Sequence, residues 1–154
     1  EYAIFSNPIF ESRTVFFFRK DKMGNWDYHD LEQLKDMRVG GATGYFYIPR
    51  FEQEGVDLDL STDTKSSFKK LYLNRVDVAI ENDVVGWEII KELYPKELYK
   101  FDSSVSPLET SSMRLMCSKK SEESQKIIDA LNKGLLVIRR DGTLDRIMGK
   151  YGVN

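Results

Sequence analysis

Between residues 37 and 94, strand-type and helix-type patterns alternate three times, and the joints between them are short. Short runs rich in valine, leucine and isoleucine are typical of strands, whereas apolar residues three or four positions apart are typical of amphipathic helices. We predict strands over 37–40, 56–60 and 76–80, each followed by a helix, the first of them over 48–54. This alternation predicts an α/β domain with a parallel sheet, in which ligands bind at the carboxyl ends of the strands.

A glycine turn, MRVGGATGYFY at residues 37–47, follows the first predicted strand. Gly40, Gly41 and Gly44 would let backbone amides face a ligand, and a helix that begins nearby would add the positive end of its dipole. The hydroxyl of Thr43 can cap that helix or reach a ligand oxygen. The turn is therefore either an anion pocket or only a tight strand-to-helix connection, and both interpretations remain open. Its spacing matches neither GxxxxGK[ST] nor GxGxxG.

Composition excludes several classes of function. The 154 residues carry a formal charge of −2, with lysines and arginines scattered among carboxylates, so we expect no nucleic-acid partner and no binding to an anionic membrane. The longest apolar run, Val15 to Phe18, is far shorter than the roughly 20 residues of a membrane-spanning helix. Cys117 is the single cysteine, which excludes an internal disulfide and a cysteine metal cluster. We expect no cofactor and no metal.

Four blocks, in this order, resemble the bacterial extracellular solute-binding proteins of family 3, the substrate-capture components of ABC importers. They are FSNPIFESRTVFFFRK (5–20), DLEQLKDMRVGGATGY (30–45), LYLNRVDVAIEN (71–82) and ALNKGLLVIRRDGTLDRIMGKYG (130–152). The last block is the most specific, because its Lys-Gly-Leu segment leads to Arg-x-Asp-Gly-Thr and ends in Lys-Tyr-Gly.

The resemblance implies an α/β fold of the type II periplasmic-binding-protein kind, with two lobes joined by two crossing strands and a ligand between the lobes. Carried over by position, residues 1–19 are the edge of the first lobe and the outgoing hinge strand, and 20–112 are the complete second lobe. Residues 113–154 are the returning hinge strand and the closing helices of the first lobe. The opening part of the first lobe is expected ahead of Glu1.

The resemblance also assigns ligand-binding residues. Ala42, Thr43, Gly44 and Tyr45 match the segment whose amides and hydroxyl bind the ligand carboxylate in similar proteins, and Thr62 is a further candidate at the end of the next strand. These residues agree with the anion pocket that the glycine turn suggests.

One departure concerns the ligand's ammonium group. Relatives that bind α-amino acids place an aspartate after the third strand, where this chain has Asn82 with Asp83 beside it. An asparagine offers a hydrogen bond without a charge, and losing a charge-assisted bond costs about 1–3 kcal/mol. Asp83 either replaces the missing aspartate or caps its own helix, so we do not expect a strong preference for α-ammonium ligands.

The function implied by the resemblance is capture of a small polar or anionic solute, such as an amino acid, for an ABC permease at a periplasmic or other extracytoplasmic site. The alternatives are the sensing domain of a receptor kinase and a dehydratase or lyase on the same fold. His29 lies in a polar loop, and Glu81 and Asp83 are a pair of acids without a recognisable partner, so we expect no enzyme.

The closing helices carry a long apolar stripe. Its members are Ile127, Ile128, Leu131, Leu135 and Ile138. Without the sheet that precedes Glu1, this stripe would be exposed, and we predict that it pairs two copies of the chain with Ile128 and Leu135 at the contact.

Overall fold

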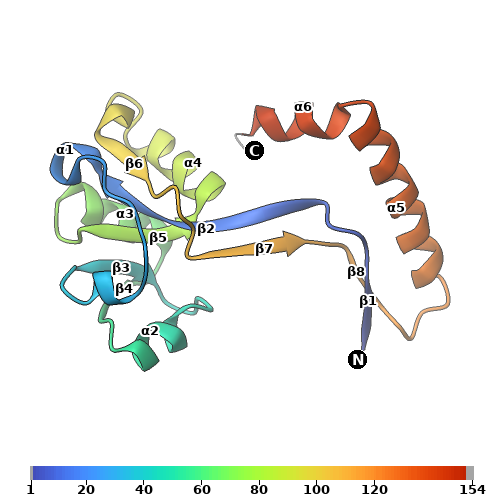
Figure 1. Ribbon diagram of the computed structural model, residues 1–154, viewed down its shortest axis with the longest axis horizontal. Helices are drawn as coiled ribbons and strands as arrows, with labels where there is room; N and C mark the ends of the chain where they lie inside the picture. The colour runs from blue at the N-terminus through green and yellow to red at the C-terminus, as the bar shows by residue number, and fades with distance from the viewer. Residues whose placement is uncertain (1, 152–154) are drawn as a thin grey trace. The chain divides into compact units, whose positions relative to one another are not determined.

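The computed structural model describes residues 2–151 and divides into two compact units (Figure 1). Unit 1 comprises Glu1–Ser12 and Ser111–Asn154, and unit 2 comprises Arg13–Thr110. Two strands, β2 (Phe10–Arg19) and β7 (Glu109–Met113), contain the boundaries between the units and pair with each other. The predicted two-lobe division placed these boundaries after residues 19 and 112.

Unit 2 is built on a sheet with the strand order β4-β3-β5-β2-β6, and β7 pairs with β2 beside this path. The strands β3 (Val39–Ala42), β4 (Leu58–Ser61) and β5 (Val78–Asn82) are parallel. β2 is antiparallel to β5 and to β6 (Phe101–Ser103). The predicted α/β organisation around parallel strands is confirmed.

Helices join the parallel strands. α2 (Ile48–Glu54) links β3 to β4, α3 (Thr64–Tyr72) links β4 to β5, and α4 (Asp83–Leu93) follows β5. The short α1 (Lys20–Met23) and the 3₁₀ helices η1 (Glu32–Leu34) and η2 (Leu98–Lys100) complete the unit. α2 has the predicted bounds, because Pro49 suits a first helical turn and Gly55 ends the helix in the left-handed conformation with φ of 72°.

The core of unit 2 lies on both faces of the sheet. Phe16 and Phe18 belong to one buried cluster and Val15 and Phe17 to the other, as expected where successive strand side chains point to opposite faces. The run from Val15 to Phe18 is therefore a strand that is buried on both faces, which explains why it is apolar at every position.

Several predicted boundaries are wrong. The three parallel strands each begin two residues later than predicted, because Val56 and Val76 are buried in the core before the backbone ladder starts at Leu58 and Val78. The segment after α4 carries no such pattern, and there η2 leads directly into β6 while β7 begins at Glu109. An apolar pattern indicates that residues are buried, but it does not show where backbone pairing begins. Buried residues just before a strand therefore look like part of the strand.

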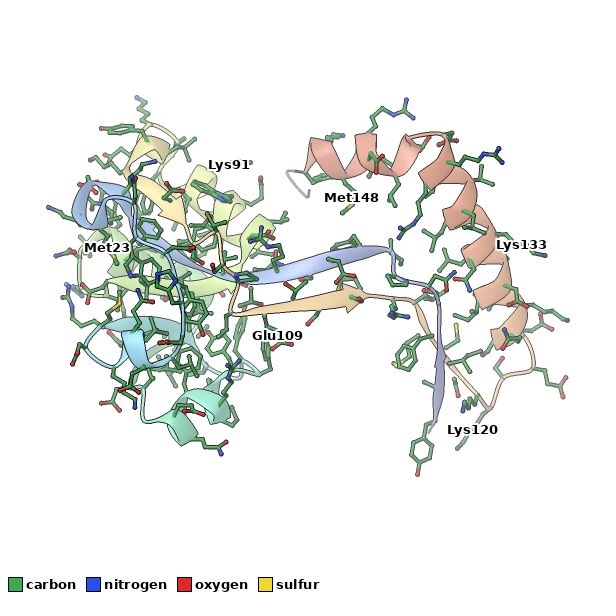
Figure 2. All side chains as sticks on the ribbon, in the orientation of Figure 1. Met23, Lys91, Glu109, Lys120, Lys133 and Met148 are labelled. Atoms are coloured by element: carbon green, nitrogen blue, oxygen red, sulfur yellow. The ribbon has the colours of Figure 1, made fainter. Side chains whose placement is uncertain are left out.

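Unit 1 contains a two-stranded antiparallel ribbon and two helices. β1 (Ala3–Phe5) pairs with β8 (Met116–Ser118), α5 (Ser124–Arg140) packs on both strands, and α6 (Thr143–Lys150) packs on α5. The Arg139 guanidinium donates to the Pro8 carbonyl at 2.6 Å, which ties α5 to the N-terminal segment. A groove of about 700 Å³ lies between that segment and the two helices, with Leu144 and Met148 in its lining. Figure 2 labels Met148 on α6.

The apolar stripe of α5 is only partly exposed. Ile128 and Leu135 are 3% and 5% exposed, so the prediction that these two side chains are available for a dimer contact is wrong. The β1/β8 ribbon and the segment tied by Arg139 give α5 a surface within its own unit. The large apolar side chains that stay exposed on the two helices are Ile127, Leu136, Val137 and Ile147.

None of the helices among residues 2–151 has the length and apolar character needed to cross a membrane.

Candidate functional site

The carboxyl ends of the three parallel strands meet at one edge of the unit 2 sheet (Figure 1). Ala42, at the end of β3, lies opposite Ser61 at the end of β4, and the Thr43 amide donates to the Ser61 carbonyl at 2.9 Å. β5 ends beside them at Asn82. The polar segments that follow the three strands are therefore brought together, as the parallel topology requires.

The glycine turn presents two backbone amides at this edge. The inner amides are already bonded, since Ala42 donates to Tyr47 Oη at 3.3 Å and Thr43 donates to Ser61. Within residues 2–151, the amides of Gly44 and Tyr45 have no hydrogen-bond partner. Gly44 has φ of 82°, which a residue with a side chain rarely adopts, so the turn depends on glycine at this position.

The helix dipole adds less to this turn than the sequence suggested. α2 begins at Ile48 and is seven residues long, so its first turn lies beyond Gly44 rather than at it. An anion at this turn would therefore depend on the amides of the turn and on the exposed Thr43 side chain, and not on the dipole of α2.

A chain of three hydroxyl and carboxyl groups joins the glycine turn to β5 and α3. The Tyr45 hydroxyl donates to Glu81 Oε2 at 2.8 Å and lies 3.1 Å from Thr64 Oγ1. The other oxygen of Glu81 accepts from the Asn82 amide at 2.7 Å. Burial, more than its polar neighbours, raises the pKa of Tyr45, so this hydroxyl keeps its proton at neutral pH.

Tyr47 supports the turn from the core. It is buried, and this burial raises the pKa of Tyr47 to about 12. A Cβ on Gly41 would lie 2.9 Å from Tyr47 Oη, so the absence of a side chain at Gly41 lets Tyr47 reach the Ala42 amide. Next to this contact the hydroxyl of Ser61 is buried, and no described residue forms a hydrogen bond with it.

The residues that replace the expected ammonium-binding aspartate are largely engaged in structure. Asn82 Oδ1 accepts from the amides of Val84 and Val85 at 3.0 and 3.2 Å, so Asn82 is the N-cap of α4. Asp83 is the first residue of α4, and its Oδ2 lies 4.0 Å from Arg13 Nη1. The helix cap that the sequence offered to Asp83 is thus supplied by Asn82.

Thr62 lies at the same edge but belongs to the start of α3. Its side chain is exposed, and its hydroxyl donates to Asp63 Oδ2 at 3.3 Å, while Asp63 caps α3 by accepting from the Ser66 amide at 2.9 Å. Sequence reasoning missed the coupling of Tyr45 to Glu81 and Thr64. Within residues 2–151, no group of three or more histidine, cysteine, aspartate or glutamate side chains is placed to hold a metal ion.

Comparisons with known proteins give structural matches without sequence matches. No protein-family model matches the chain, and no curated protein matches it in sequence. Among solved structures, a mutant of ArgBP from T. maritima matches with a TM-score of 0.69 and 17% identity over 97% of this chain and 62% of that one. Substrate-binding domain 2 of GlnP from Lactococcus lactis, in an open conformation, matches with a TM-score of 0.71 and 19% identity. This match covers 97% of this chain and 62% of that one.

A third match is the ancestral amino-acid-binding protein AncCDT-1, described as a precursor of cyclohexadienyl dehydratase. It has a TM-score of 0.64 and 15% identity over 97% of this chain and 61% of that one. The chain thus spans less than two thirds of the length of these structures. The resemblance found in the sequence is confirmed at the level of fold: the chain is an α/β protein with the type II periplasmic-binding-protein-like fold of these amino-acid-binding proteins.

Proposed function

We propose that the chain is the larger part of a solute-binding protein that captures a small polar or anionic solute, such as an amino acid, for an ABC importer. Binding takes place at the carboxyl edge of the unit 2 sheet, around Ala42, Thr43, Gly44 and Tyr45, with Thr62, Asn82 and Asp83 at its border. The full-length protein would deliver the solute to an ABC permease from an extracytoplasmic compartment.

The observation that carries this proposal is the pair of amides at Gly44 and Tyr45, which have no hydrogen-bond partner within residues 2–151. They lie at the edge where ligands bind in open parallel sheets. The Thr43 hydroxyl beside them is exposed and can add a third donor. A carboxylate accepts such a set of donors well, because hydrogen bonds to an ionised group are stronger than those to a neutral one.

We also propose that the chain does not catalyse a reaction, although AncCDT-1 shows that the fold occurs next to enzymes in evolution. Both oxygens of Glu81 are engaged by internal donors. His29 is exposed, and its amide donates to the Gln33 side chain in the loop before η1. A general acid or base must reach a substrate, which Glu81, buried and bonded on both oxygens, does not do in this arrangement.

The test is an NMR titration of the ¹⁵N-labelled chain with acetate, sulfate and neutral amino acids. We expect shifts at the amides of residues 41–45, which are reduced in Thr43→Val and largely lost in Gly44→Ala. Gly24→Ala is the matched control, because Gly24 also has a positive φ, of 64°, and open space around its Cα. If no ligand perturbs residues 41–45 at millimolar concentration, the glycine turn is only a connection and the proposal fails.

A further inference from the structure

Glu81 is a buried carboxylate without an ion-pair partner. Its residue is 3% exposed, and within residues 2–151 no lysine or arginine forms a salt bridge with it. Burying an unpaired charge is expensive unless hydrogen bonds compensate. The two donors to Glu81 are the Asn82 amide and the Tyr45 hydroxyl. Neither donor is a cation, so the Glu81 carboxyl group has no positively charged neighbour at the end of the sheet where Tyr45 lies.

The proton arrangement around Tyr45 follows from these contacts. A carboxylate only accepts, so the Tyr45 hydroxyl donates its single proton to Glu81. The hydroxyl of Thr64, 3.1 Å from Tyr45 Oη, must then donate to Tyr45. Tyr45 thus has no hydroxyl proton left for a ligand. A ligand can therefore contact Tyr45 only through its backbone amide or its aromatic ring.

The ring of Tyr45 is half-buried. One side packs against the core cluster that contains Tyr47, with 5.4 Å between the two ring centroids. An aromatic face attracts cations because of its quadrupole, and the attraction increases when the site is partly desolvated. Donation of the phenol hydrogen bond to the Glu81 carboxyl group, 2.8 Å away at the hydroxyl end of the ring, increases the electron density of the ring.

Cationic side chains already occupy another tyrosine of unit 2. Arg19, at the end of β2, lies 5.5 Å from the ring centroid of Tyr72, and Lys100, in η2, lies 5.9 Å from it. Within residues 2–151, no lysine or arginine lies over the ring of Tyr45. Arg13, at the same edge of the sheet, is instead directed to Asp83. The cation-binding face of Tyr45 is therefore not used by the protein itself.

We propose that the ring of Tyr45, whose hydroxyl is hydrogen-bonded to the Glu81 carboxyl group, binds a cationic group of the ligand, either a guanidinium or an alkylammonium. This inference rests on the proposed function, because the ring lies at the same edge as the amides of Gly44 and Tyr45. Tyr45 and Glu81 would thus recognise the positive charge that Asn82, which follows Glu81 in β5, has no carboxylate to bind. The solute is then one that carries both an anionic and a cationic group.

The test compares methylguanidinium with methylurea, which has nearly the same shape and no charge. Both are titrated by NMR at concentrations too low to unfold the chain and at constant ionic strength. We expect methylguanidinium to shift the Tyr45 ring and the neighbouring amides, and methylurea to bind at least about fivefold more weakly. Glu81→Gln and Tyr45→Leu should remove most of that difference. Tyr45→Phe, which keeps the ring and loses the bond to Glu81, should be intermediate.

Tyr99→Leu is the control, because Tyr99 is 74% exposed in η2, its hydroxyl is not bonded to a carboxylate in the described structure, and its ring already carries Lys100 Nζ at 5.9 Å from the centroid. It should leave both affinities unchanged. Equal binding of the two probes, or an equal loss in Tyr99→Leu, would overturn the inference. Failure of the two proposals is distinguishable: Gly44→Ala should abolish acetate binding while the preference for methylguanidinium persists. If neither probe binds and acetate does, only the cation site is refuted.

Discussion

Substitution of Gly86 by alanine should destabilise unit 2, although the same change usually stabilises a helix. Gly86 lies inside α4, and a Cβ there would be 2.2 Å from Phe17 Cε2 and 2.3 Å from Phe17 Cζ. Replacing a glycine in a helix interior by alanine contributes about 1 kcal/mol of stability. Overpacking a core costs about 1–3 kcal/mol.

The cost of overpacking should exceed the gain in helix propensity, because the Phe17 ring has little room to move. Phe17 is fully buried, and its ring centroid lies 5.2 Å from that of Phe68 and 5.7 Å from that of Trp87. The clash therefore lies near the upper end of the range, and the net loss for Gly86→Ala should be about 1–2 kcal/mol. The control is Gly134→Ala, in the interior of α5, where an added Cβ meets nothing within 4 Å. It should gain about 1 kcal/mol.

Urea unfolding measures both variants. The two tryptophans, Trp26 and Trp87, lie in unit 2, so their fluorescence reports the unfolding of that unit, while far-UV circular dichroism also follows α5 in unit 1. Gly86→Ala should lower the urea midpoint seen by fluorescence with an unchanged slope. A variant as stable as the parent would refute the reasoning, because it would show that the Phe17 ring can shift at no cost.

Three further predictions concern the site and the helices. Tyr47 is neutral in both the folded and the unfolded state below pH 10, and its folded pKa is raised from 10.0 to about 12, so its stabilising contribution should be lost as the pH rises from 10 to 12. Tyr47→Phe should be slightly less stable than the parent at pH 8 and should lose less stability by pH 12; parallel losses in urea titrations would contradict this. Asn82→Ala should lower the free energy of unfolding by about 1 kcal/mol, because it removes the N-cap of α4. Asn82→Asp should keep the cap and bind neutral amino acids more tightly than the parent does. Equal urea midpoints for Asn82→Ala and the parent would argue against the cap. We also propose a homodimer whose contact is formed by the exposed Leu136 and Val137 of α5. Leu136→Lys should then shift the sedimentation coefficient to that of a monomer. A parent chain that is monomeric at high micromolar concentration would refute this proposal.

The elements of unit 2 could be predicted because their signals are local. The alternation of strand and helix patterns and the turn residues depend on neighbours within one segment. Asn74, which follows α3, is an example, because asparagine tolerates the left-handed conformation better than most residues and its φ is 55°. The ends of the strands could not be predicted with the same certainty, because they depend on where a partner strand offers hydrogen bonds. Val76 is buried like a strand residue, yet pairing of β5 begins at Val78.

The surface around α5 shows the same limit at the level of packing. The stripe that contains Ile128 and Leu135 was correctly identified as apolar, but its sequence does not say which surface covers it. The β1/β8 ribbon comes from segments more than 100 residues apart, since Ile4 pairs with Cys117. Such a pairing has no local signal, so the burial of Ile128 and Leu135 could not be foreseen from the helix alone.

The site depends on a shift of two residues at the end of β5. With a strand that ends at Ile80, Glu81 belongs to a loop and is free to face a ligand beside Asp83. The strand instead continues to Asn82 and pairs Glu81 with Val15, which turns the Glu81 side chain toward the face that carries Val15 and Ala79. Glu81 thereby becomes an interior charge that Tyr45 must satisfy, although the two residues are 36 positions apart. The same extension places Asn82 where α4 begins and makes it the cap. Glu81 is therefore bonded inside the fold on both of its oxygens, instead of lying free beside Asp83 as a strand that ended at Ile80 would have allowed.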